Sequence, residues 1–133
     1  MRHCTIRNIK HKWLETSLLR SILLSKCVTT TVQRAKKIRP VVEKFITMSR
    51  DALREGVPVS ERLAKERSIR AKLRSRKTDE VVNTLIKDIV PVVKDKNGGY
   101  TRIVRLSTKR KGDGAEMARF MIIGFEGGQL ARS

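Results

Sequence analysis

Residues 27–47 read CVTTTVQRAKKIRPVVEKFIT, and the pattern changes in the middle of this stretch. Cys27–Thr31 holds a β-branched run, which fits a pleated strand better than a helix. From Val32 to about Arg54 the large apolar residues recur at helical spacing, interrupted by Pro40. We therefore predict a short strand that leads directly into a helix, with a kink or a new helix start at the proline.

Upstream of this strand the sequence predicts another helix and an arm. From Lys12 onward, apolar residues fall on one helical stripe that ends shortly before the strand. Residues 1–11, MRHCTIRNIKH, show no clean period. We expect them to form an irregular basic N-terminal arm.

Two further helices are predicted after the first strand–helix unit. Ser60 is a suitable N-cap for the stretch SERLAKERSIRAKLRSRK, residues 60–77, which is rich in lysine and arginine. Thr78 precedes DEVVNTLIKDIV, where a clear apolar stripe follows two acidic residues. We expect Pro91 to stop that helix.

The last third of the chain predicts a β-hairpin. Two strand-like runs, Tyr100–Ser107 and Ala115–Gly124, are joined by a turn that contains the hairpin dipeptide Asp113-Gly114. The predicted fold is α+β, with a small sheet made of the early strand and the hairpin, packed against three to four helices. Residues 12–126 should form a single domain, and residues 127–133 a loose tail.

Charge dominates the composition. The chain has 31 Lys and Arg against 13 Asp and Glu, a formal net charge of +18, and an isoelectric point near 11.0. Such a surplus destabilises a compact chain unless a polyanion lies against it, so we expect a nucleic-acid partner. No apolar run approaches the roughly 20 residues of a membrane span, and we expect neither a membrane partner nor a signal peptide.

Catalytic and metal-binding patterns are weak. The sequence has no phosphate-binding Walker loop, no nucleophile elbow and no zinc-protease motif. His3, Cys4, His11 and Cys27 do not have the spacing of paired zinc ligands, and so few cysteines indicate free thiols. We predict neither enzymatic activity nor a cofactor, a metal ion or a small-molecule substrate.

Basic clusters carry the functional prediction, because runs of one sign repel each other unless a counter-surface compensates. A solvated charged face is the alternative. The glycines Gly98-Gly99 allow either a simple turn or a close approach to phosphate, and the tyrosine after them could be a core residue or a stacking residue. The candidate RNA-binding residues are Arg2, Lys10, Lys12, Arg34, Lys36, Lys37, Arg39, Arg67, Arg70, Arg74, Tyr100, Thr101, Arg102, Lys109, Arg110 and Lys111.

Several of these stretches together resemble the family of bacterial-type large-subunit ribosomal protein seventeen. The similar segments are TTTVQRAKKIRPVVEKFIT (residues 29–47), GGYTRI (residues 98–103) and GDGAEMA (residues 112–118). The start MRH is also similar, whereas the following CTIRNIKHKW is shorter than the corresponding part of that family and lacks its motifs.

The resemblance implies a structural protein of the large ribosomal subunit that binds rRNA and supports translation. It also implies neighbouring large-subunit proteins, with ribosomal protein thirty-two as a candidate. We favour a location in the bacterial cytoplasm over an organelle matrix, with an organellar transit peptide as the alternative, because residues 1–26 are basic and have Glu15 as their single acid. An RNA- or DNA-binding protein outside the ribosome, of the nucleoid or RNA-chaperone type, is the alternative interpretation.

Overall fold

The computed structural model describes residues 2–73 and 78–125, with side chains from residue 13 onward in these ranges. In chain order the elements are α1 (Arg2–Ser25), β1 (Cys27–Thr31), α2 (Val32–Ala52), α3 (Val59–Leu73), α4 (Thr78–Thr84), the π-helical turn η1 (Leu85–Ile89), α5 (Val90–Val93), β2 (Thr101–Lys109) and β3 (Glu116–Ile122). This order confirms the predicted α+β class, and β1 has the predicted bounds.

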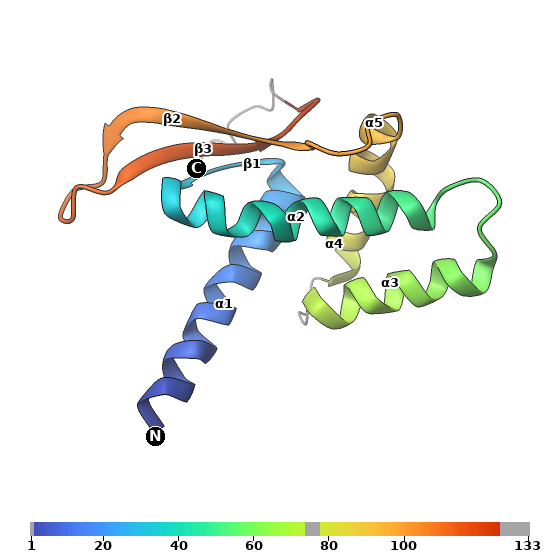
Figure 1. Ribbon diagram of the computed structural model, residues 1–133, viewed down its shortest axis with the longest axis horizontal. Coiled ribbons are helices and arrows are strands. Elements are labelled where there is room, and N and C mark those ends of the chain that lie inside the picture. Colours follow the sequence, from blue (N-terminus) through green and yellow to red (C-terminus); the bar gives the residue numbers. More distant parts are fainter. Residues whose placement is uncertain (1, 74–77, 126–133) are drawn as a thin grey trace.

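The three strands form one antiparallel sheet in the order β1-β3-β2. The hairpin therefore places β3 in the centre, and β1 pairs with it from the other side, with Thr31 opposite Met117. Figure 1 shows α2 lying along one face of this sheet, with α3 on the far side of α2 and with α1 and α4 crossing behind it. The sheet thus has its helices on one side, as the sequence predicts.

Helix α2 is the central element of the core. Its apolar residues recur every three or four positions, so one stripe is buried from Ala35 through Ile38 and Val42 to Ile46. This stripe belongs to a single buried cluster that includes side chains of α1, α3, α4, η1 and β3. Pro40 lies on the exposed side of α2 and does not end the helix.

Residues 2–11 belong to α1, so the prediction of an irregular arm is wrong for them. This segment contains no proline or glycine, and a helix nucleated by the following residues can extend through it. Figure 1 shows this end of α1 projecting away from the other elements. An apolar period marks a helix with one buried face, so its absence does not exclude a helix.

Pro91 does not stop its helix either, because the chain continues as α5 to Val93. The preceding turn, Leu85–Ile89, is π-helical, and the backbone N–H of Val90 donates to the carbonyl of Leu85, five residues earlier. A widened turn shifts the carbonyl that a proline ring would otherwise meet. The π turn thus lets the helix pass the proline.

Other boundaries differ by one or two residues. Helix α3 begins at Val59, and the carbonyl of Pro58 accepts the N–H groups of Glu61 and Arg62, so Ser60 is inside the helix and is not its N-cap. The hairpin is confirmed, although β2 runs two residues further than predicted and β3 is shorter at both ends. The predicted tail, residues 127–133, lies outside the described residues.

Candidate nucleic-acid interface

The segment GGYTRI, residues 98–103, mainly connects α2 to the sheet. Tyr100 is fully buried. Its hydroxyl accepts a hydrogen bond from Nη1 of Arg50 at 2.8 Å and donates to the carbonyl of Lys96 at 3.2 Å. Arg50 also donates to that carbonyl at 2.6 Å, and its hydrogen bond to Asp51 raises the pKa of the guanidinium. Tyr100 is therefore a core residue that holds the turn before β2 against α2.

Thr101 continues this connection. Its side chain is buried, and its hydroxyl donates to Oε1 of Glu43 on α2 at 2.7 Å. The prediction that the side chains of Tyr100 and Thr101 contact RNA is therefore wrong for this conformation, because neither reaches the surface. Arg102, the next residue along β2, is exposed.

The first half of α2 presents a row of exposed cations. Arg34 and Lys36 form no ion pair with any residue that the structure describes. Lys37 is held by Glu15 of α1, with 2.5 Å between Nζ and Oε1, and Arg39 by Glu43, with 3.2 Å between Nε and Oε1. Sequence spacing along α2 cannot reveal the partner of Lys37, because Glu15 lies on another element.

The hairpin turn carries a second group of cations with divided roles. The guanidinium of Arg110 binds the carboxylate of Asp113, which also accepts the backbone N–H of Ala115 at 3.3 Å. These contacts, chiefly the one from Arg110, hold the pKa of Asp113 well below its usual range. Arg110 therefore stabilises the turn, whereas Lys109 and Lys111 are exposed and form no ion pair within residues 13–73 and 78–125.

Helix α3 differs from both groups, because acids neutralise much of its charge. Arg62 pairs with Glu66, Lys65 with Glu61, and Arg70 with Asp79. The solvated, mixed-sign interpretation therefore applies to most of this helix. Of the predicted residues on it, Arg67 is exposed, and Arg74 lies outside the described residues. Figure 1 shows α3 at the opposite end of the molecule from the hairpin turn.

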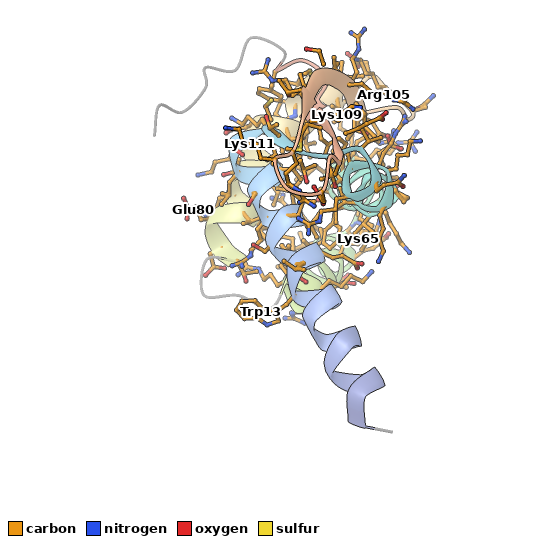
Figure 2. All side chains as sticks on the ribbon, turned by 90° about the vertical axis from the view of Figure 1, so that its left-hand side faces the viewer. Trp13, Lys65, Glu80, Arg105, Lys109 and Lys111 are labelled. Atoms are coloured by element: carbon orange, nitrogen blue, oxygen red, sulfur yellow. The ribbon has the colours of Figure 1, made fainter. Side chains whose placement is uncertain are left out.

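The strand register brings the α2 cations and the hairpin cations to the same end of the molecule. Helix α2 follows Thr31 directly, Thr31 faces Met117, and the adjacent Glu116 faces Lys109. Figure 2 looks onto this end and shows Arg105, Lys109 and Lys111 on the hairpin beside the axis of α2. We call Arg34, Lys36, Lys37, Lys109 and Lys111 the cationic end. The predicted residues Arg2, Lys10 and Lys12 lie on the α1 backbone, and their side chains are outside the described set.

Metal-binding and membrane-spanning features are not found in the described part of the chain. No three His, Cys, Asp or Glu residues there gather as a metal site requires, and Cys27 is a free thiol. No described helix is both long enough and apolar enough to cross a bilayer.

Comparison with known proteins identifies the family. A family model described as Ribosomal protein L17 matches residues 14–123. The chain belongs to the ribosomal protein L17 family. Named relatives are large ribosomal subunit protein bL17 of Petrotoga mobilis, 35% identical over 84% of this chain and 84% of the relative, and bL17 of Exiguobacterium sibiricum, 35% identical over 81% and 86%. The bL17 protein of Persephonella marina is 41% identical over 68% of this chain and 64% of the relative.

The L17 match agrees with the resemblance seen in GGYTRI and in the strand–helix unit. It spans all three strands, α2 and the whole cationic end, and it begins at Leu14 in the middle of α1. Ribosomal protein L17 is a structural, non-enzymatic component of the ribosome, so membership of its family confirms the prediction that the chain is not an enzyme.

Proposed function

We propose that this L17-family protein is a structural constituent of the large ribosomal subunit and binds large-subunit rRNA through the cationic end. Residues 12–126 would form the rRNA-binding domain. The proposed role is to stabilise folded rRNA by neutralising phosphate charge, because α2 and the hairpin place several lysines and arginines at one end of the molecule.

One observation carries this proposal. The cationic end concentrates exposed cations, and four of the five, Arg34, Lys36, Lys109 and Lys111, form no ion pair in the described structure. On α3, by contrast, acids pair with three of the five described cations. Cations that the fold leaves unneutralised are the ones expected to meet phosphate.

The test compares two variants from which the same charge is removed at different places. Replacing Arg34, Lys36, Lys109 and Lys111 by Ala should weaken rRNA binding and reduce the slope of log affinity against log salt by about 0.7 to 0.9 for each phosphate that the variant no longer neutralises. The control replaces four ion-paired cations, Arg62, Lys65, Arg70 and Lys94, by Ala. Equal weakening in both variants, measured by filter binding across a salt series, would contradict a localised contact surface.

The finer assignments rest on the resemblance. We propose that neighbouring large-subunit proteins, ribosomal protein thirty-two among them, contact the chain, that Arg102 contributes an rRNA contact, and that the ribosome is that of a bacterial cytoplasm. Fractionation tests the role in the ribosome. The protein should stay with large subunits through moderate salt, whereas a nucleoid protein or RNA chaperone would be recovered free of them.

A further inference from the structure

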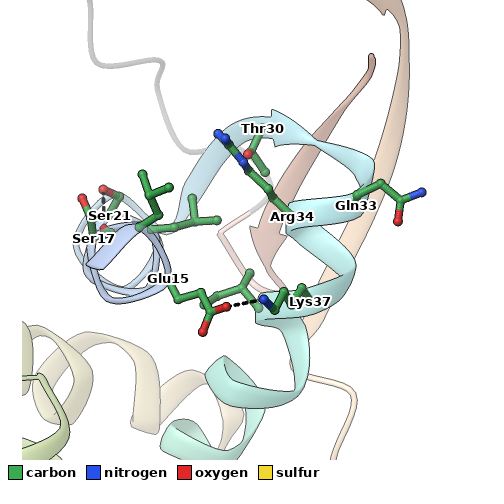
Figure 3. A pocket seen from close by; sticks show the side chains of 10 residues that line it. Glu15, Ser17, Ser21, Thr30, Gln33, Arg34 and Lys37 are labelled. Carbon is green, nitrogen blue, oxygen red and sulfur yellow. Dashed lines mark hydrogen bonds and ion pairs between the residues drawn. The ribbon is translucent and has the colours of Figure 1, made fainter. Parts of the chain in front are cut away.

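A groove of about 380 Å³ lies between α1 and the start of α2 (Figure 3). The apolar wall of the groove is formed by Leu14 and Leu18 of α1 and by Ile38 of α2. Ser17, Ser21 and Thr30 add hydroxyl groups. Pockets for small molecules typically measure about 300 to 1,000 Å³, so this groove has room for one small group rather than for a helix.

The charged residues of the groove are unequally satisfied. Glu15 and Lys37 meet across it and form an ion pair between the two helices (Figure 3). Arg34 extends from α2 toward the α1 side of the groove, and no described acid pairs with it. The groove therefore combines apolar walls with one available guanidinium.

We propose that this groove binds a single unpaired nucleotide of rRNA, turned out of its helical stack. The proposal rests on the proposed function. The base would lie against Leu14 and Leu18 with the Arg34 guanidinium on its face, because RNA-binding proteins stack exposed bases on arginine planes. The adjoining phosphate would lie on Lys37, which also lines the groove, three residues beyond Arg34 along α2.

The charge of Arg34 favours RNA over an apolar peptide of a neighbouring protein as the occupant of the groove. An apolar peptide segment in the groove would cover the Arg34 guanidinium without neutralising it, and burying an unpaired charge is unfavourable. A nucleotide brings both a flat apolar surface and a negative phosphate. The groove also opens beside the cationic end, where the backbone of the same RNA is expected.

The experiment adds a side chain at the groove and leaves both the net charge of the protein and its buried core unchanged. Ser17 lines the groove and is exposed, and it follows Leu14 by one helical turn, so Ser17→Phe adds a bulky ring at the α1 edge of the groove. Ser60→Phe is the matched control, because Ser60 is an exposed helical serine on α3, away from the groove. Each protein is bound to large-subunit rRNA, and base reactivity toward dimethyl sulfate and affinity are measured.

Wild type and Ser60→Phe are expected to protect one unpaired base. Ser17→Phe should leave that base reactive and should bind the rRNA about tenfold more weakly, which is within the range that one stacked base contributes. Arg34→Lys keeps the charge and removes the planar group, and it should abolish the same protection.

If either variant keeps wild-type base protection, the proposal is overturned while the cationic-end interface stands. Release of a neighbouring protein from the subunit by Ser17→Phe, with unchanged rRNA reactivity, would assign the groove to that protein instead. Failure of the wild type to bind rRNA would overturn the proposed function itself.

Discussion

Thr101 and Arg102 are sequence neighbours whose side chains have opposite surroundings. Side chains alternate between the two faces of a strand, so Thr101 enters the interface with α2 while Arg102 stays exposed. A motif of a few residues therefore combines a structural role with a candidate RNA contact, and each residue needs its own test.

Replacing Thr101 by Val should lower the free energy of unfolding by about 1 to 3 kcal/mol. The change keeps the shape but removes the hydrogen bond to Glu43, which then retains only Arg39 among the described residues, and a hydrogen bond to a charged acceptor contributes more than a neutral one. Urea denaturation measures the effect. Thr108→Val on the exposed outer part of β2 is the control and should stay within about 0.5 kcal/mol of wild type. Equal stabilities of the two variants would show that the Glu43 contact contributes nothing.

At the scale of elements, the strand–helix unit was predictable and its tertiary consequences were not. The β-branched run of β1 and the apolar spacing of α2 are local signals, and both elements form where those signals predict them. The π turn before Pro91 depends on how the helix packs on either side of the proline, which no local pattern encodes.

The candidate site shows the same division between local and tertiary information. Lysine and arginine runs locate the cations of α2 and of the hairpin. The sequence does not tell which of them are neutralised, because the Glu15 partner of Lys37 comes from another helix. Burial of Tyr100 likewise depends on Arg50, fifty residues away along the chain.

The turn that leads into β2 provides a prediction for its two glycines. Gly99 has a φ of +65°, in the left-handed region that is unfavourable for other residues, whereas Gly98 does not have a positive φ. A Cβ at either position would meet no atom within 4 Å, so any effect is conformational. Gly99→Ala should destabilise the protein by about 1 to 2 kcal/mol, while Gly98→Ala should be neutral or slightly stabilising. Thermal unfolding of the two variants measures the difference, and equal melting temperatures would contradict the assigned turn.

At the scale of the whole molecule, the net charge of +18 should limit stability in dilute buffer. Repulsion among exposed cations weakens with ionic strength, because salt at about 0.15 M screens interactions beyond roughly 8 Å. We therefore expect the melting temperature of the isolated protein to rise between about 0.01 M and 0.3 M sodium chloride. Calorimetry across this series measures the shift. The variant that lacks Arg34, Lys36, Lys109 and Lys111 should show a smaller shift, and a melting temperature independent of salt would contradict self-repulsion.

The separation between the ion-paired cations of α3 and the unpaired cations of the cationic end has a kinetic consequence. Unpaired cations gathered at one extremity strengthen the positive field there, so a polyanion attracts that end at a distance. The molecule would rotate during its diffusional approach and arrive with the hairpin leading. Productive collisions would then be far more frequent than random orientation allows, and assembly would be fastest in dilute electrolyte.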